Sequence, residues 1–268
     1  MFTEDYHIHT EMSHDSDAKH MDACARAAEL GIDEIAFTDH YDIGLTEIEE
    51  GCNFNVAEMK EKVGLCREKY KDRLKIRFGI EIGQPHNDLE RSLEVIKRAE
   101  YDFVLCSLHN NKSGIDFYYV DYKNINFDEL YESYLSDIDD MIKNFKDFDV
   151  LAHVTYPVRY AMKTIKSFDV TKHYPHLREI FKKLISMGKG IEVNLSTLRT
   201  GLSDPMPDFE TVKLYKKLGG EIITIGSDAH FSHHVGSEVH DSVRTLYEMG
   251  FKYLATYENR KLKMKKIL

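Results

Sequence analysis

Side chains able to bind metal ions recur along this chain directly after short apolar segments. His7 and His9 end the first segment, and His40 follows the second. The complete set of candidate ligands is His7, His9, His14, His40, Glu81, His109, His153, Asp228 and His230. Imidazole nitrogens and carboxylate oxygens suit Zn, Fe and Mn, and the absence of cysteine from these positions argues against a structural zinc site.

The spacing of these residues indicates that they share ions. Residues two apart on a strand point to the same side, so His7 and His9 can bind one ion. Asp228 and His230 can likewise bind one ion, or two ions in contact. Nine candidates are too many for one tetrahedral or octahedral ion that also binds water. We therefore expect two or three divalent ions (Zn, Fe or Mn), bridged by a carboxylate and a hydroxide.

The segments before these side chains have the character of β-strands. The predicted strands are Asp5–Ile8, Glu34–Phe37, Ile76–Ile82, Phe103–Cys106, Val150–Ala152, Ile191–Leu195 and Ile222–Ile225. Most are nearly continuous apolar runs, which is typical of parallel strands covered on both faces. Segments with helical periodicity lie between them, and glycines such as Gly31 and Gly188 follow the helices. This repeat predicts βα units around a parallel sheet.

Two α/β architectures fit such a repeat. An open doubly wound sheet binds ligands mainly at one switch point, whereas a barrel collects them from many strand ends. Six of the seven predicted strands lead into a His, Asp or Glu, which favours a barrel. No linker or shift in composition interrupts residues 1–268, so we expect one domain. Lys252–Tyr257 is a weaker eighth unit, and we interpret the basic run after Asn259 as a solvated helical face.

Composition and charge exclude several classes of protein. The chain has 268 residues, 42% of them hydrophobic, and a formal net charge of −10. Apolar residues recur throughout, which excludes a disordered chain, and the acidic balance argues against nucleic-acid or membrane-surface binding. The N-terminal residues lack a secretory signal, and no apolar run approaches the ~20 residues that span a bilayer. The four cysteines contain no C-x-x-C pair, so we expect free thiols and a cytoplasmic protein. The oligomeric state stays open.

The motifs resemble those of the PHP (polymerase and histidinol phosphatase) family. The resemblance covers nearly the whole chain and follows the family order. It rests on His7-Ile8-His9-Thr10, Thr38-Asp39-His40, Gly79-Ile80-Glu81, Ser107-Leu108-His109, Ala152-His153 and Gly226-Ser227-Asp228-Ala229-His230. Within the family, the length and the first two motifs resemble the stand-alone histidinol-phosphate phosphatases. The resemblance implies a distorted (β/α)7 barrel that hydrolyses L-histidinol phosphate to L-histidinol and phosphate, a step of histidine biosynthesis.

The resemblance also implies a trinuclear metal centre. Its ligand sets would be His7, His9, Glu81 and Asp228 for the first ion, Glu81, His109 and His153 for the second, and His14, His40 and His230 for the third. A hydroxide that bridges the ions would attack phosphorus in one in-line step, and Asp228 would accept its proton.

Residues near the strand ends are candidates for binding the substrate. Arg159 and Arg199 lie just beyond the fifth and sixth predicted strands, and arginine binds phosphate through two parallel hydrogen bonds. The ammonium and imidazole of histidinol phosphate would meet a carboxylate and an aromatic ring in a pocket partly walled by the loop 110–126. The candidates for these contacts are Asp42, Asp15, Tyr118, Tyr156 and His233.

Three other functions use similar residues. An exonuclease-like enzyme or a phosphatase of nucleotides or other small phosphate esters would bind the same ions, although the acidic composition disfavours a polynucleotide. An amidohydrolase also carries H-x-H and a late Asp, but it typically has a lysine or a single His after the fourth strand. This chain instead places Glu81 after the third strand and His109 after the fourth. A non-catalytic metal-binding module would be expected to lack some of the ligands.

Overall fold

Seven parallel strands form the centre of the molecule in the computed structural model, which describes residues 1–44 and 54–268. Their order in the sheet is β1-β2-β4-β5-β6-β7-β8, with the short strand β3 paired to β4. The strands are β1 (Glu4–Ile8), β2 (Glu34–Phe37), β3 (His40–Asp42), β4 (Lys75–Gly83), β5 (Phe103–Ser107), β6 (Val150–Leu151), β7 (Gly190–Asn194) and β8 (Ile223–Gly226). The first and last strands meet through a parallel bridge between Ile8 and Ala229. The sheet therefore curls into a distorted barrel, as the sequence predicted.

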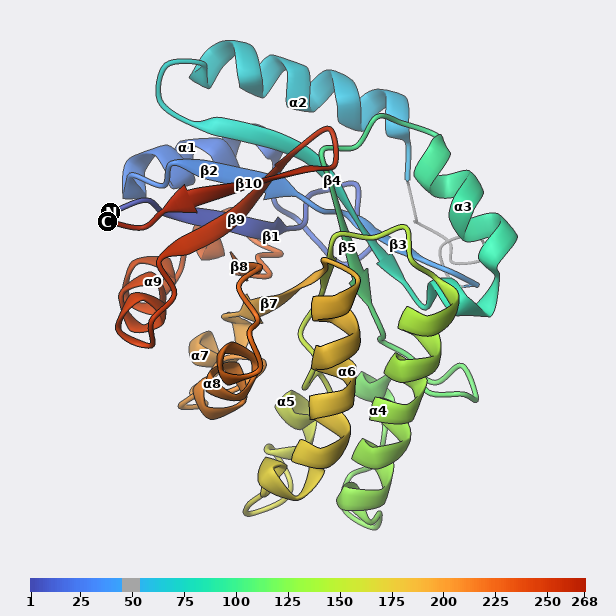
Figure 1. The fold of residues 1–268 in the computed structure, drawn as a ribbon. Helices are drawn as coiled ribbons and strands as arrows, with labels where there is room; N and C mark the ends of the chain where they lie inside the picture. The colour runs from blue at the N-terminus through green and yellow to red at the C-terminus, as the bar shows by residue number, and fades with distance from the viewer. Residues whose placement is uncertain (45–53) are drawn as a thin grey trace.

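The helices cover the outside of this sheet (Figure 1). The long ones are α1 (His20–Leu30), α2 (Val56–Tyr70), α3 (Leu89–Lys97), α4 (Phe127–Asn144), α6 (Tyr174–Ser186), α8 (Phe209–Lys217) and α9 (Val239–Glu248). The short turns are α5 (Val158–Ala161), α7 (Ser196–Arg199), η1 (Pro85–Asn87), η2 (Phe117–Tyr119), η3 (Val170–His173) and η4 (Ser232–His234). Helix α6 buries Leu177, Ile180, Phe181 and Leu184. Each such side chain contributes roughly 1.5–3 kcal/mol when fully buried, so the apolar stripe holds the helix on the sheet.

The C-terminal segment differs from the prediction. The run interpreted as a solvated helical face is a strand, β10 (Lys261–Lys266), paired antiparallel with β9 (Tyr253–Glu258). Asn259 and Arg260 connect the strands with positive φ values of 50° and 61°, the conformation of a two-residue hairpin turn. Lysines alternate with Leu262 and Met264 along β10, and this period of two favours a strand over a helix. The predicted eighth unit is therefore one half of a hairpin.

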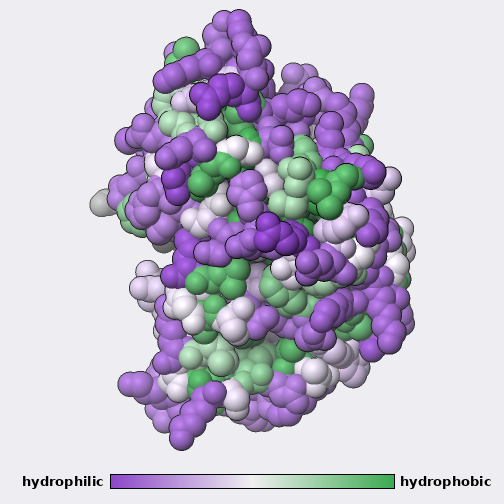
Figure 2. Space-filling model, turned by 90° about the vertical axis from the view of Figure 1, so that its left-hand side faces the viewer, coloured by the Kyte–Doolittle hydropathy of each residue, from purple (hydrophilic) through white to green (hydrophobic). Residues whose placement is uncertain are grey.

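Hydrophilic side chains predominate on the face shown in Figure 2, where hydrophobic residues form separate patches. Cys24, Cys66 and Cys106 are buried free thiols, as predicted; Cys52 lies outside the described residues. None of the helices in the described parts of the chain has the length and apolar character needed to span a bilayer. The cytoplasmic location stays a prediction.

Candidate metal centre

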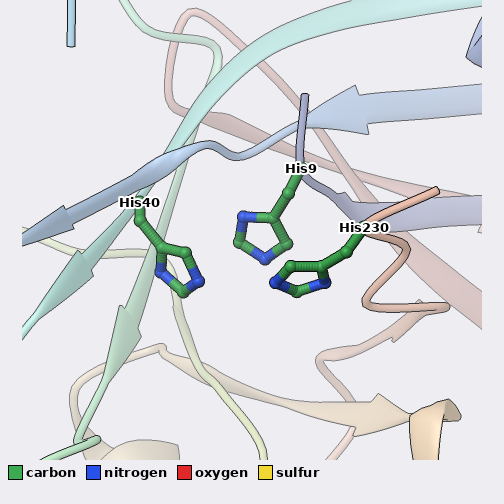
Figure 3. Close-up of side chains that lie close together, drawn as sticks. All are labelled: His9, His40 and His230. Carbon is green, nitrogen blue, oxygen red and sulfur yellow. The ribbon is translucent and has the colours of Figure 1, made fainter. Parts of the chain in front are cut away.

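The carboxyl ends of the barrel strands bring most of the predicted ligands to one place. His9 directly follows β1, His40 begins β3, and His230 lies in the loop after β8. In Figure 3 the imidazole rings of these three residues point toward one another from three separate segments. The His9 and His40 ring centres are 4.1 Å apart, and those of His9 and His230 are 4.3 Å apart. Residues more than 200 positions apart in the sequence therefore share one site.

Potential ligand atoms gather in four overlapping groups in the described parts of the chain. Within each group the ligand atoms lie no more than 4.8 Å from one another. The groups are His9, His40 and His230; His7, His9 and Glu81; His40, Asp42 and His109; and Glu81, His109 and His153. Asp228 borders the second group, since its Oδ1 lies 3.4 Å from His9 Nε2 and 3.8 Å from His7 Nε2. Because neighbouring groups share residues, the site suits several adjacent ions.

Glu81 occupies the middle of the cluster and is fully buried. Its Oε2 lies 3.3 Å from His7 Nε2, 3.5 Å from His9 Nε2 and 2.8 Å from His40 Nδ1. None of these contacts has hydrogen-bonding geometry, so Oε2 has no hydrogen-bond partner among the described residues. Its Oε1 faces His153 Nε2 at 3.1 Å. The two oxygens thus face different histidines, as expected of a carboxylate that bridges two ions.

The electrostatics of the two central acids favour their ionised forms. Burial alone would raise the pKa of Glu81, but His7, His40 and His109 hold it well below its usual range. Burial also acts against ionisation of Asp228, yet His7 and the other neighbouring cations hold its pKa well below the ordinary value. Both carboxylates are therefore available as anionic ligands at neutral pH.

Glu192 supports the cluster and was missed in the sequence. It lies in β7, and its Oε1 is 2.6 Å from His7 Nδ1. Its Oε2 accepts a hydrogen bond from the backbone N–H of His153 at 3.0 Å. A carboxylate on one ring nitrogen of a ligating His fixes the tautomer and directs the other nitrogen toward the metal. The available signal was a pair of polar residues, Glu192 and Asn194, inside the one predicted strand that supplied no ligand.

Asp42 occupies a different position from the one predicted. It was expected to meet the substrate, but it is 4% exposed and its Oδ1 lies 2.8 Å from His109 Nδ1. The same oxygen accepts a hydrogen bond from Gln84 Nε2 at 3.0 Å. The structure therefore places Asp42 behind His109, where it orients the imidazole as Glu192 orients His7.

Two glycines leave room for these supporting carboxylates. A Cβ on Gly83 would overlap Asp42 Oδ1, and a Cβ on Gly226 would overlap both Glu192 Oε1 and the Cβ of His7. A side chain at either position would displace a carboxylate from its histidine. Gly83 and Gly226 are thus required because the supporting carboxylates approach the backbone too closely to leave room for a side chain.

The two predicted arginines hold Asp228 from different sides. The Arg159 Nη1 donates a hydrogen bond to Asp228 Oδ2 at 3.2 Å. The guanidinium of Arg199 instead bonds to the backbone carbonyls of Ser227 and Asp228, the latter at 3.0 Å. Asp228 has a positive φ of 52°, which is uncommon for a residue other than glycine. Arg199 therefore stabilises the backbone turn that presents Asp228, and Arg159 contacts the side chain.

A cleft of about 490 Å³ opens over the cluster. Its lining residues are Asp15, His40, Glu81, His109, Tyr118, His153, Tyr156, Arg159, Tyr160, Asp228, His230 and Phe231. Tyr118 comes from the loop 110–126, which was predicted to wall the pocket. Three predicted residues have other surroundings. Arg199 and His233 are not among the lining residues, and His14 is exposed with its ring centre 5.8 Å from that of His40.

The residues present fit divalent metal ions. His7 Nε2 and His9 Nε2 face each other at 2.9 Å, and His109 Nε2 and His153 Nε2 do so at 3.4 Å. Paired nitrogens around an unpartnered, buried carboxylate oxygen are the donor set that ions such as Zn²⁺ require. The barrel and this site together define a metal-dependent enzyme.

Comparison with known proteins identifies the family. A family model described as "PHP domain" matches residues 5–196. The chain is 28% identical over 266 residues to the histidinol-phosphatase of Lactococcus lactis, covering 96% of this chain and 95% of that protein. It is 31% identical over 251 residues to the "Probable histidinol-phosphatase" of Thermotoga maritima, covering 94% of each. The crystal structure of the histidinol phosphate phosphatase of Lactococcus lactis, in complex with zinc, L-histidinol and phosphate, has a TM-score of 0.88 at 27% identity and covers 97% of this chain and 98% of that one. This chain belongs to the PHP domain family, which confirms the resemblance.

Proposed function

We propose that the protein is a metal-dependent phosphomonoesterase that hydrolyses L-histidinol phosphate to L-histidinol and phosphate. The observation that carries the proposal is the cluster of histidines around Glu81 and Asp228 at the carboxyl ends of the barrel strands. Relatives named histidinol-phosphatase align with this chain over nearly its whole length, and a structural neighbour is described as binding zinc, L-histidinol and phosphate.

We propose two to three divalent ions (Zn, Fe or Mn) at this site. The residues that would hold them are His7, His9, His14, His40, Glu81, His109, His153, Asp228 and His230. Bound ions would supply an activated water as nucleophile and neutralise the phosphoryl oxygens. The four overlapping ligand groups support more than one ion.

The arginine on the cleft wall binds the phosphate in this proposal. Arg159 lines the cleft, and its guanidinium already lies 3.2 Å from the carboxylate oxygen of Asp228. A planar guanidinium can donate two parallel hydrogen bonds to phosphoryl oxygens. Asp228 accepts the proton of the attacking water, because its carboxylate is ionised and faces the same cleft. Arg199 contributes by holding the Asp228 turn.

A substrate comparison tests the proposal. The protein is loaded with Zn, Mn or Fe, and phosphate release is measured from L-histidinol phosphate, 4-nitrophenyl phosphate, a nucleoside monophosphate and a sugar phosphate. We expect the highest kcat/KM for L-histidinol phosphate. A higher kcat/KM for the nucleotide or the sugar phosphate would contradict the proposed substrate, and hydrolysis of none of the four would contradict the proposed reaction.

A further inference from the structure

The loop after β1 folds back so that Ser13 lies against the ring of His9. The backbone N–H of Ser13 donates a hydrogen bond to the carbonyl of Thr10 at 2.8 Å, which closes a tight turn over residues 10–13. This turn places the Ser13 hydroxyl oxygen 3.2 Å from His9 Nδ1. The other ring nitrogen of His9, Nε2, faces His7 Nε2 at 2.9 Å. The two nitrogens of His9 therefore have different surroundings, one at the histidine cluster and one at a buried serine.

Asp39 holds both ends of this turn and is fully buried. Its Oδ1 accepts hydrogen bonds from the backbone N–H of Thr10 at 2.6 Å and from the hydroxyl of Ser13 at 2.8 Å. Its Oδ2 accepts another from the hydroxyl of Thr10 at 2.9 Å. Because Oδ1 already accepts a backbone N–H, it offers Ser13 a lone pair and not a proton. The hydroxyl proton of Ser13 is therefore directed to Asp39.

The remaining contacts of Ser13 determine where His9 carries its proton. A serine hydroxyl donates one hydrogen bond and can accept two. Ser13 donates to Asp39 and accepts the backbone N–H of His40 at 3.0 Å. Its second lone pair faces His9 Nδ1, and only an N–H on that nitrogen can match it. A neutral His9 thus carries its proton on Nδ1 and presents the lone pair of Nε2 to the cluster.

We propose that Ser13, held by Asp39, is a positioning residue that fixes the metal-binding nitrogen of His9. The inference rests on the proposed function, because it assumes that the cluster binds metal ions. A ligating histidine generally donates its second ring nitrogen to a fixed partner, and Ser13 supplies that partner for His9. Since Ser13 also accepts the backbone N–H of His40, this one side chain sets the relative position of two candidate ligands.

The support of His9 differs from that of two other histidines in the cluster. Carboxylates contact His7 and His109 directly. A neutral hydroxyl instead separates the His9 ring from the Asp39 carboxylate. A carboxylate raises the basicity of a ligating imidazole in addition to fixing its tautomer. Ser13 therefore fixes the tautomer while the negative charge stays one hydrogen bond further away.

The tautomer of His9 in the folded, zinc-loaded protein tests the proposal directly. Heteronuclear NMR of the histidine rings distinguishes a protonated nitrogen from a metal-bound one, and the His9 signals are identified by their absence from His9→Gln. We expect a proton on Nδ1 and metal at Nε2. A proton on Nε2, or metal bound through Nδ1, would overturn the proposal whether or not the variants of Ser13 fold.

Ser13→Ala removes the hydroxyl and leaves the Nδ1–H of His9 without its partner. Ser92→Ala is the matched control, because Ser92 is also buried and its hydroxyl bonds to the backbone carbonyls of Pro85 and Asp88 at 2.8 and 2.7 Å. Zinc affinity is measured by competition with a chelator. We expect Ser13→Ala to lower it by roughly tenfold or more, and Ser92→Ala to change it by less than about twofold. A wild-type zinc affinity for Ser13→Ala, or equal losses for the two variants, would overturn the positioning role.

Asp39→Asn separates the charge of this chain of hydrogen bonds from its geometry. An amide oxygen at the place of Oδ1 can still accept from the Thr10 backbone N–H and from Ser13, so the contacts are kept while the charge is lost. We expect the tautomer of His9 to be retained and the loss of zinc affinity to be smaller than that of Ser13→Ala. A larger loss would contradict the proposal, since Asp39 would then act on the cluster by another route.

These measurements need no substrate, so they separate the positioning role from the proposed function. A protein that hydrolyses L-histidinol phosphate but keeps its zinc affinity in Ser13→Ala retains the function and loses the positioning residue. A protein with the expected tautomer and zinc affinities that hydrolyses no phosphate ester retains the positioning residue and loses the function.

Discussion

Replacement of Glu192 by glutamine should weaken metal binding without unfolding the protein. The carboxylate is 1% exposed and serves two histidines, with Oε1 2.6 Å from His7 Nδ1 and Oε2 3.0 Å from the backbone nitrogen of His153. A glutamine side chain has almost the same shape but only one acceptor oxygen. In either orientation of the amide, its NH₂ group therefore faces an N–H group, that of the His7 ring or that of the His153 backbone. Two N–H donors cannot form a hydrogen bond with each other.

The magnitude follows from the lost hydrogen bond. A hydrogen bond to a charged group contributes about 1.5–3 kcal/mol, and about 1.4 kcal/mol corresponds to a tenfold change in an equilibrium constant. The expected loss is therefore roughly 10- to 100-fold in metal affinity, the range observed when the partner of a ligating histidine is removed. Because His7 loses its fixed tautomer, kcat should fall in parallel.

The assay is competition for zinc between the protein and a chelator of known affinity, with circular dichroism to verify that the variant is folded. Glu221→Gln is the control, because Glu221 is exposed and its carboxylate pairs with Lys216 at 2.6 Å, away from the histidines of the cluster. A folded Glu192→Gln variant with wild-type zinc affinity and kcat would refute the role assigned to Glu192.

Three further predictions follow from single contacts. Gly83→Ala should displace the carboxylate that orients His109 and lower activity and zinc affinity by roughly tenfold or more; unchanged metal content and kcat would contradict this. Arg159→Met should raise KM for L-histidinol phosphate by roughly tenfold or more, as steady-state kinetics would show, through loss of a charged hydrogen bond; a wild-type KM would contradict the phosphate contact. Burial and Glu34 raise the pKa of Glu4 well above its value of 4.5 in the unfolded chain, so the folded state loses stability as pH rises through the folded pKa. Glu4→Gln should therefore raise Tm at pH 8 by about 3–6 °C for each unit of pKa shift, which corresponds to about 1.4 kcal/mol, and should leave Tm unchanged at pH 4. An equal change at both pH values would refute this.

The barrel could be predicted because its strands are buried on both faces. The predicted run Phe103–Cys106 is continuously apolar, which is typical of a parallel strand covered on both faces, and all five residues of the observed strand β5 are buried. The C-terminal hairpin could not be predicted in this way. Strand β10 is largely exposed, so it lacks the continuous apolar run that marked the barrel strands, and only the alternation of lysines with Leu262 and Met264 indicated a strand.

The candidate site was predictable to the extent that ligand residues follow strand ends. His9, His40 and His230 were expected in one metal centre, and the structure brings their rings together. The prediction had assigned His9 to the first ion, and His40 and His230 to the third ion with His14. The supporting carboxylates were less visible, because Glu192 lies within an apolar strand and Asp42 in a strand of three residues. Their roles depend on which histidine lies beside them in space, and spacing along the chain carries no such information.

The most direct test of the central claim is zinc content measured together with phosphate release from L-histidinol phosphate, before and after chelation. We expect at least two ions per chain in the active protein, loss of activity when they are removed, and recovery when zinc, manganese or iron is restored. Full activity in protein that retains less than one ion per chain would contradict a metal-dependent phosphatase.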